Sequence, residues 1–524
     1  MKLKSYISGA WQEGGGQAAK LINPATEEVL AESSTHGIDF AAALEHARGV
    51  GGPALRRLTF AERAVCLQAM YDALYGHREE LIELSIRNGG NTRNDAKFDV
   101  DGASATLLAY AAYGGQLGEQ TILLDGEPDQ LGRTPRYAGR HILTPLRGAA
   151  VHINAYNFPA WGFAEKAAVA VLAGMPVISK PATSTALLAH RIMEILLDAG
   201  AVPEGALSFI AGSAGDLLDH LGPQDVLAFT GSGDTAARLR RIDAHTRASA
   251  RINVEADSLN AALLGPDVAV GSETWQMMIR EITTDVRQKA GQKCTAIRRV
   301  LVPPARIEEC VGALEAQLAS ITVGDPAHAD VRMGPLVNAA QRDDVRAGVA
   351  AIGAEAARVC GDPEPTGLTG VEDGRGFFVT PFLFRCEDAA AAEAIHAREV
   401  FGPAVTVMGY DAVEDAVALC ARGGGALVSS VYSDDRAFAR DMLVALAPYH
   451  GRLTLGGEKV AGISPGPGTV MPAMVHGGPG RAGGGEELGG LRGLSFYLQR
   501  TAVQGYRPLI EKFFPSTTED QQQD

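Results

Sequence analysis

One cysteine in this chain stands where its thiol could do chemistry. Cys294 lies within residues 289–296, which read Lys-Ala-Gly-Gln-Lys-Cys-Thr-Ala, between a predicted helix at 274–289 and a predicted strand at 299–302. At such a junction a side chain can face a cleft between domains, where a thiol can act as a nucleophile. A lone cysteine is more often a small buried hydrophobic residue, so the local run leaves both interpretations open.

Polar residues follow five predicted strands, at 149–153, 175–179, 207–210, 226–229 and 252–254. Predicted helices at 160–173, 183–199, 213–220 and 234–242 separate them, and this alternation is typical of a parallel sheet. Ligands of such sheets bind beyond the carboxyl ends of the strands. The residues that follow the strands there are Asn157, Lys180, Ser213, Thr230-Gly231-Ser232 and Glu255.

These strand ends predict a nucleotide site, because helix N-termini with small residues suit phosphate groups. A second interpretation comes from residues 231–236, which satisfy G-x-G-x-x-A, with Glu255 about twenty residues further on. In an ordinary dinucleotide-binding fold that acid would bind the ribose. The fingerprint belongs on the first strand of its domain, however, and here it follows the fourth.

Composition excludes several classes of protein. The 524 residues are 46% hydrophobic and 21% charged, which is ordinary for a globular chain of about three structural units. The net charge of −15 disfavours a nucleic-acid partner. The six cysteines show no CxxC spacing, and no metal-ligand motif appears. No signal peptide or membrane-spanning run is visible, so a cytoplasmic protein without membrane contact is expected.

Taken together, the motifs resemble the aldehyde dehydrogenase superfamily over nearly the whole chain. The match rests on eight segments in the family's order. They are N-P-A-T-x-E at 23–28, N-F-P at 157–159, K-P-A at 180–182, F-T-G-S at 229–232, G-Q-x-C-x-A at 291–296, G-D-P at 324–326, G-P-L at 334–336 and E-x-F-G-P at 399–403.

The resemblance implies a role for each matched residue. Cys294 would attack the aldehyde, and the Asn157 amide with the Cys294 backbone N–H would hold the oxyanion. Glu255 would activate the water that hydrolyses the resulting thioester. The expected cofactor-binding residues are Lys180, Thr183, Ser213, Thr230, Gly231, Ser232, Glu399 and Phe401. No metal is expected.

One departure from the family pattern predicts the choice of cofactor. NAD-using relatives often place a glutamate shortly after the K-P pair, where it binds the adenosine ribose, and this chain has Thr183. A carboxylate there would repel a 2′-phosphate, whereas a hydroxyl beside Lys180 could bond it. We therefore expect NADP to be the cofactor, with NAD used less well.

Residues 151–160 and 497–505 resemble a specialised branch of the superfamily. This branch contains the dehydrogenase half of phenylacetate ring-opening enzymes and stand-alone enzymes of the benzoyl-CoA epoxidation (box) pathway of benzoate degradation. The second group is favoured, because no hydratase-like domain follows position 505. The implied reaction is oxidation of a CoA-thioester semialdehyde to the acid. A CoA-acylating dehydrogenase, a cysteine thioesterase or hydrolase, and a non-catalytic scaffold are the alternatives.

The fold class that follows is α/β, with two parallel-sheet domains and an antiparallel extension. We expect a Rossmann-like cofactor-binding domain at 1–125 and 143–259 and a catalytic domain at 260–450. The oligomerisation extension is expected at 126–142 and 480–510, with a Gly-dense loop at 477–490 and a flexible tail at 515–524. Open strand edges in the extension invite pairing, so a homodimer or larger homo-oligomer is expected.

Overall fold

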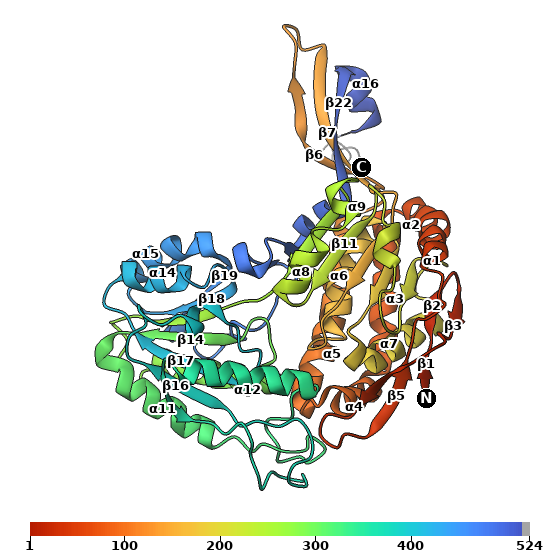
Figure 1. The fold of residues 1–524 in the computed structure, drawn as a ribbon. Helices are drawn as coiled ribbons and strands as arrows, with labels where there is room; N and C mark the ends of the chain where they lie inside the picture. The colour runs from red at the N-terminus through yellow and green to blue at the C-terminus, as the bar shows by residue number, and fades with distance from the viewer. Residues whose placement is uncertain (516–524) are drawn as a thin grey trace.

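The structure, a computed structural model, describes residues 1–515 and shows two α/β lobes with a narrow extension projecting from one of them (Figure 1). The predicted α/β fold with two parallel-rich sheets is confirmed. The predicted flexible tail, 515–524, lies outside the described residues except for Pro515.

The first lobe contains a seven-stranded sheet in the order β12-β11-β8-β9-β10-β2-β3. Its five predicted strands are present to within two residues and are parallel, whereas the hairpin β2–β3 adds an antiparallel edge that we did not predict. In sheet order, the bounds are Arg251–Glu255, Val226–Thr230, Ala150–Ile153, Val177–Lys180, Leu207–Phe209, Ser5–Ile7 and Ala10–Gln12. A small sheet, β1-β5-β4, comprises Lys2–Leu3, Val29–Ser33 and Ala19–Ile22.

The second lobe contains another seven-stranded sheet, in the order β15-β16-β17-β14-β13-β18-β19. All of its pairings are parallel except that of β15 with β16. In sheet order, the bounds are Ala357–Cys360, Phe382–Cys386, Ala404–Gly409, Ile297–Val302, Asn260–Leu264, Ala426–Tyr432 and His450–Gly456. The last strand carries this sheet past the boundary predicted at residue 450.

Helices flank both sheets. Those of the first lobe are α1 Phe40–His46, α2 Gly52–Arg57, α3 Phe60–Gly76, α4 Arg78–Gly89, α5 Arg93–Leu117, α6 Trp161–Ala173, α7 Ala186–Asp198, α8 Gly233–Leu239 and α9 Asp243–Thr246. Those of the second are α10 Glu273–Arg287, α11 Ile307–Ala319, α12 Ala339–Gly353, α13 Ala394–Ala397, α14 Val413–Ala421 and α15 Arg436–Leu446. The helix expected at 213–220 is only a single turn, Leu217–His220, because the glycines at 212 and 215 take left-handed conformations before it.

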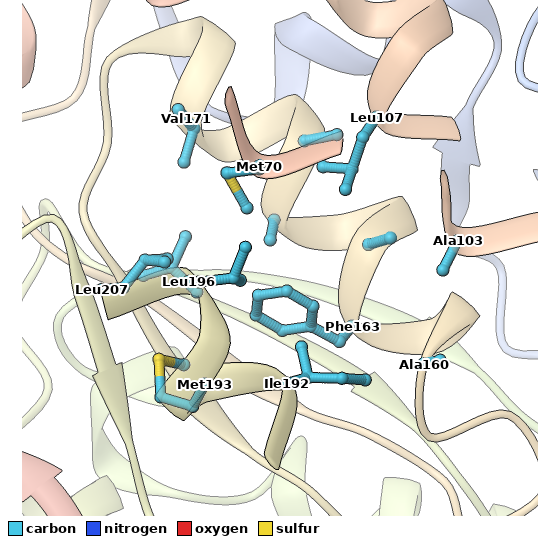
Figure 2. Packing of buried hydrophobic residues seen from close by; sticks show 14 of the residues in the cluster. Met70, Ala103, Leu107, Ala160, Phe163, Val171, Ile192, Met193, Leu196 and Leu207 are labelled. Atoms are coloured by element: carbon cyan, nitrogen blue, oxygen red, sulfur yellow. The ribbon is translucent and has the colours of Figure 1, made fainter. Parts of the chain in front are cut away.

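The first lobe packs around α6, every residue of which is buried. Its side chains meet those of α3, α5, α7 and β10, as Met70, Leu107, Phe163, Ile192 and Leu207 show in Figure 2. The helix begins at Trp161, four residues after Asn157, and ends at Gly174 in the left-handed conformation. A helix enclosed on all sides is held rigidly by close packing, so it fixes the strand end from which Asn157 comes.

The extension is a three-stranded antiparallel sheet, β22-β7-β6, joined by the helix α16. Their bounds are Leu498–Tyr506, Tyr137–Pro145, Leu123–Gln130 and Arg507–Phe513. Within the segment expected at 480–510, Leu488 and Leu494 are buried in the core of the first lobe. The domain boundaries stay predictions. Within residues 1–515, no helix is long and apolar enough to cross a membrane.

The enclosed position of α6 predicts the stability of a core variant. Replacing the buried Phe163 by alanine should lower the free energy of unfolding by about 3–5 kcal/mol, because a cavity replaces the ring. The shift in urea midpoint at fixed protein concentration measures this change. The matched control is Val65→Ala on α3, where the side chain is exposed and the expected change is within about 0.5 kcal/mol. Equal shifts in the two variants would contradict this account of the core.

Candidate active site

The three residues expected to do chemistry line one cavity. Asn157, Glu255 and Cys294 share a space of about 460 Å³ with Thr230 and with side chains from α6 and the 468–476 segment. Asn157 follows β8, Glu255 ends β12 and Cys294 precedes β14. The cavity therefore draws residues from the carboxyl ends of the first sheet and from the second lobe.

Glu255 is buried and forms an ion pair that the sequence did not reveal. Its Oε2 lies 3.2 Å from Nε2 of His476, and Thr230 Oγ1 donates a hydrogen bond to the same oxygen at 3.4 Å. Burial alone would raise the pKa of Glu255, but the charge of His476, with that of Lys166, lowers it to about 2. The same pairing raises the pKa of His476 against the opposing effect of burial. Each partner therefore favours the charged form of the other.

Cys294 faces this pair as a protonated thiol. Its Sγ, a ring nitrogen of His476 and a carboxylate oxygen of Glu255 all lie within 4.8 Å of one another. Burial raises the pKa of the Cys294 thiol well above its usual range, and the negative charge of Glu255 raises it further. The thiolate, which is the nucleophile, therefore forms only when the surrounding charges are rearranged.

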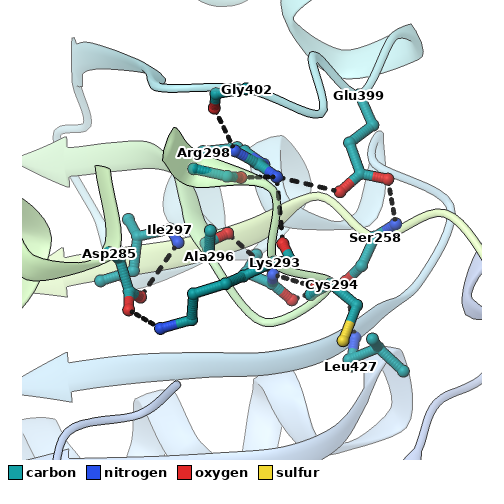
Figure 3. A network of polar contacts seen from close by, with 12 residues as sticks. Ser258, Asp285, Lys293, Cys294, Ala296, Ile297, Arg298, Glu399, Gly402 and Leu427 are labelled. Carbon is teal, nitrogen blue, oxygen red and sulfur yellow. Dashed lines mark hydrogen bonds and ion pairs between the residues drawn. The ribbon is translucent and has the colours of Figure 1, made fainter. Parts of the chain in front are cut away.

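A network of polar contacts holds the loop that carries Cys294 (Figure 3). The buried Arg298 guanidinium donates to the carbonyl oxygens of Gly291, Lys293 and Gly402 at 2.7–3.0 Å. Asp285, at the end of α10, accepts from Lys293 Nζ at 2.8 Å and from the Ile297 N–H at 3.2 Å. Both sides of the cysteine are therefore fixed.

The backbone before the cysteine takes an unusual path. Lys289, Ala290 and Gly291 have φ values of 54°, 52° and 68°, which place three successive residues in the left-handed region. That region costs a residue with a side chain about 1–2 kcal/mol. At Gly291 a Cβ would come 2.2 Å from the Gly402 carbonyl oxygen. The close approach shows why glycine is needed in this part of the motif.

Four buried charged groups beside Glu255 were missed by the sequence analysis. Lys166 Nζ lies 3.2 Å from Glu165 and 3.1 Å from Glu487, and oxygens of Glu165, Glu255 and Glu487 lie within 4.8 Å of one another. His476 is the fourth. Glu165-Lys166 could have been noticed as two adjacent charges inside an otherwise apolar helix. His476 and Glu487 gave no such signal, because a long Gly-rich segment separates them.

That segment is not the extended loop that the sequence predicted. It contains the hairpin β20–β21, Val475–Gly477 and Glu486–Leu488, in which His476 pairs with Glu487. At Gly485 a Cβ would come 2.4 Å from the Val254 carbonyl oxygen, and the Gly485 N–H donates to that oxygen at 3.1 Å. The glycines therefore let the hairpin lie directly against β12, which brings His476 to Glu255.

A second cavity brings together Lys180, Thr183 and Ser213 from the cofactor prediction. It opens to solvent and is lined by residues 33–38, the end of β9, the turns after β9 and β10, and α8. Lys180 is largely buried, and burial lowers the pKa of its amine. An open cavity with a cation at the ends of parallel strands fits a phosphate-bearing cofactor.

The remaining expected cofactor residues occupy other positions. Ser232 caps α8 by accepting from the Thr235 N–H, and the Gly231 N–H donates to the Glu255 carbonyl oxygen. Glu399 accepts from the Ser258 N–H at 3.0 Å and pairs with Arg298, and burial raises the pKa of its carboxyl to about 7. Phe401 lies against the Arg298 guanidinium. Because Glu255 faces Cys294, the geometry does not favour assigning it to a ribose.

The comparisons with known proteins agree with this geometry. The model of the aldehyde dehydrogenase family matches residues 11–503. The chain belongs to the aldehyde dehydrogenase family. It is therefore an oxidoreductase that oxidises an aldehyde with a nicotinamide cofactor and a catalytic cysteine, as the motifs led us to expect.

The chain is similar to two curated relatives, and its fold is similar to that of two solved structures. It is 45% identical over 479 residues to 3,4-dehydroadipyl-CoA semialdehyde dehydrogenase of Aromatoleum evansii, covering 91% of this chain and 93% of that protein. It is 42% identical over 175 residues to Protein MaoC of Klebsiella aerogenes, covering 33% and 50% of the two chains. Its fold is similar to that of apo betaine aldehyde dehydrogenase of Staphylococcus aureus, with a TM-score of 0.83 and 23% identity over 96% of this chain and 95% of that chain. It is also similar to that of aldehyde dehydrogenase of Bacillus cereus in complex with NAD⁺, with a TM-score of 0.82 and 23% identity over 97% of each chain.

The charge of Glu255 makes a prediction about thiol reactivity. Glu255→Gln should lower the pKa of Cys294 and accelerate its alkylation by iodoacetamide at pH 8 about tenfold, because one pKa unit changes the thiolate fraction tenfold. Peptide mass spectrometry reads the rate at Cys294 itself, since Cys66 and Cys360 are also only partly buried. A slower reaction in the variant would contradict the assigned charge effect.

Proposed function

We propose that this enzyme oxidises a CoA-thioester semialdehyde, such as 3,4-dehydroadipyl-CoA semialdehyde, to the acid with NADP. The observation that carries the proposal is the convergence of Cys294, Glu255 and Asn157 on one cavity. The substrate class is supported by the 45% identity with the Aromatoleum enzyme over nearly the full length of both chains. The same likeness supports a place in the breakdown of an aromatic compound.

The chain's own residues define a sequence of steps. Cys294 Sγ gives its proton to the Glu255 carboxylate and bonds to the aldehyde carbon, and the Asn157 amide with the Cys294 backbone N–H donates hydrogen bonds to the developing oxyanion. A nicotinamide cofactor would supply the hydride acceptor that converts this adduct to a thioester on Cys294. Glu255 releases the thiol proton to solvent. Glu255 then takes a proton from water as its oxygen attacks the thioester carbon. The acid departs and Sγ is released.

The buried carboxylate distinguishes hydrolysis from transfer to CoA. An acylating dehydrogenase passes the thioester to a thiol and needs no base to activate water, whereas Glu255 is positioned beside Cys294 for that purpose. A cysteine hydrolase would need an imidazole near the thiol, and His476 provides one. The second cavity and the family membership nevertheless favour the redox reaction.

Cofactor residues are proposed from the second cavity and the family motifs together. Lys180, Thr183 and Ser213 line that cavity, and Lys180 with Thr183 suits a 2′-phosphate. Thr230 lines the Cys294 cavity, where it would be near the reacting end of the cofactor. Gly231, Ser232, Glu399 and Phe401 are assigned to the cofactor on the motifs.

The extension is proposed to pair two subunits. Among residues 1–515, β6 and β22 are the outer strands of this sheet and each pairs with β7, and the sheet projects away from the lobes (Figure 1). Exposed edges favour association with another chain. The proposed unit is a homodimer or a larger homo-oligomer located in the cytoplasm.

Initial rates test the proposed reaction. The enzyme should reduce NADP with a medium-chain aliphatic aldehyde and, at higher kcat/KM, with a CoA-thioester semialdehyde. Cys294→Ala should lower kcat/KM at least a thousandfold (order of magnitude), because the nucleophile is gone. Thiol titration should show that free CoA is not consumed. Stoichiometric loss of CoA would establish the acylating reaction instead, and ester turnover without any aldehyde oxidation would establish the hydrolase.

Substitution at Thr183 tests the cofactor assignment. Thr183→Glu should lower the ratio of kcat/KM for NADP to that for NAD by about ten- to a hundredfold, because a charge-assisted bond becomes a repulsion. Thr183→Val, which removes the hydroxyl without adding charge, should give a smaller decrease. An unchanged ratio in both variants would exclude Thr183 from cofactor selection.

A further inference from the structure

His476 is a buried titratable group beside Cys294 and Glu255 that the proposed steps leave unused. Its side chain is 4% exposed and that of Glu255 is 2% exposed, with 3.2 Å between Nε2 and Oε2. It also lines the cavity of Asn157 and Cys294. Burying an ion pair this deeply costs desolvation energy, whereas an apolar contact in the same place would not.

Glu255 alone is a poor base while this pair is intact. The neighbouring imidazolium lowers the pKa of the carboxyl to about 2, and a base so weak takes little share of a proton from water or a thiol. When His476 is neutral, the same carboxylate becomes a stronger base. The imidazole is therefore the group whose protonation state decides what Glu255 can do.

We propose that His476 is a positioning and proton-holding residue that acts through Glu255. This role rests on the proposed function and deepens it. When His476 is neutral, the thiol gives up its proton to the pair: the S–H bond breaks, His476 Nε2 gains the proton, and Glu255 remains a carboxylate between the thiolate and the imidazolium. The charge of His476 thereby offsets that of Sγ at the moment of attack on the aldehyde.

The proton balance also accounts for the second half of the reaction. After the thioester has formed, His476 releases its proton to solvent, and this is the proton that aldehyde oxidation by NADP must produce. Water then attacks the thioester carbon, and its proton moves through Glu255 to the neutral His476. The acid departs, which leaves a thiolate and an imidazolium ready for the next aldehyde.

The charges around His476 are compatible with this cycle. From α6, Glu165 favours its protonated form, and from β19, Arg452 disfavours it. Glu487 stands opposite on β21 and is itself paired with Lys166. Glu255 and Cys294 complete the set. Among these charges Glu255 has the largest effect on the pKa of His476, so the state of His476 follows that of Glu255 and Cys294.

Alkylation of Cys294 by iodoacetamide, followed between pH 6 and 10 by peptide mass spectrometry, tests the proposal without cofactor or substrate. His476→Gln keeps an N–H donor but cannot hold the extra proton, so the profile should move to higher pH and the rate at pH 8 should fall about tenfold or more. His476→Phe should shift the pH profile of alkylation in the same direction. In a Glu255→Gln background, the His476→Gln change should have little further effect, because the imidazole acts through the carboxylate.

The matched control is His152→Gln. His152 is also buried in the first lobe, beside Tyr497, and burial keeps its imidazole neutral by lowering its pKa. This variant should leave the pH profile of Cys294 alkylation unchanged. In the dehydrogenase assay, the acid limb of the plot of kcat/KM against pH should move to higher pH for His476→Gln. It should not move for His152→Gln.

The outcomes separate the two proposals. If both His476 variants melt at the wild-type temperature and alkylate with the wild-type profile, the role of His476 is overturned. If wild type oxidises aldehydes normally in that case, the proposed function stands. If the profile moves as expected but no aldehyde is oxidised, His476 controls the thiol while the proposed function fails.

Discussion

The structure depends on how firmly the loop of Cys294 is held. Arg298 donates to three carbonyl oxygens of that loop and its neighbour, and Asp285 anchors the other side through Lys293 and Ile297. Asn260, on β13, donates to the carbonyl oxygens of Cys294 and Ala296, both at 2.8 Å. Hydrogen bonds to charged groups contribute about 1.5–3 kcal/mol each. Their sum offsets the cost of the left-handed turn at 289–291 and leaves Sγ in one place.

A cluster of buried charges, supported by the first sheet, lies opposite the hydrogen-bonded loop of Cys294. Glu255 lies on β12, and Glu165 and Lys166 lie on the enclosed helix α6. His476 and Glu487 lie on the glycine-rich hairpin. Each carboxylate in the cluster has a cation within about 3 Å, as buried charges require. The nucleophile and the charges that govern its proton therefore come from different lobes and meet only in the folded chain.

Much of this arrangement follows from local patterns in the sequence. The five parallel strands, α6 and α10 could be predicted because apolar runs and helical periodicity are strong over those lengths, and the residues at strand ends located one edge of the sheet. Glu399 illustrates the limit. Its motif suggested a cofactor role, whereas the described contacts are to Ser258 and Arg298. His476 and Glu487 could not be found, because their pairing depends on a hairpin whose glycines read as a loop and whose register is set by contact with β12.

The most direct test of the account is to trap the covalent intermediate. Glu255→Gln should form the thioester on Cys294 and then hydrolyse it slowly. After rapid mixing with NADP and an aldehyde, the account predicts a burst of NADPH close to one per active site. The acyl mass should be found on the Cys294 peptide in the quenched sample. Steady turnover without a burst, or acyl mass on any other residue, would contradict the assignment of nucleophile and base.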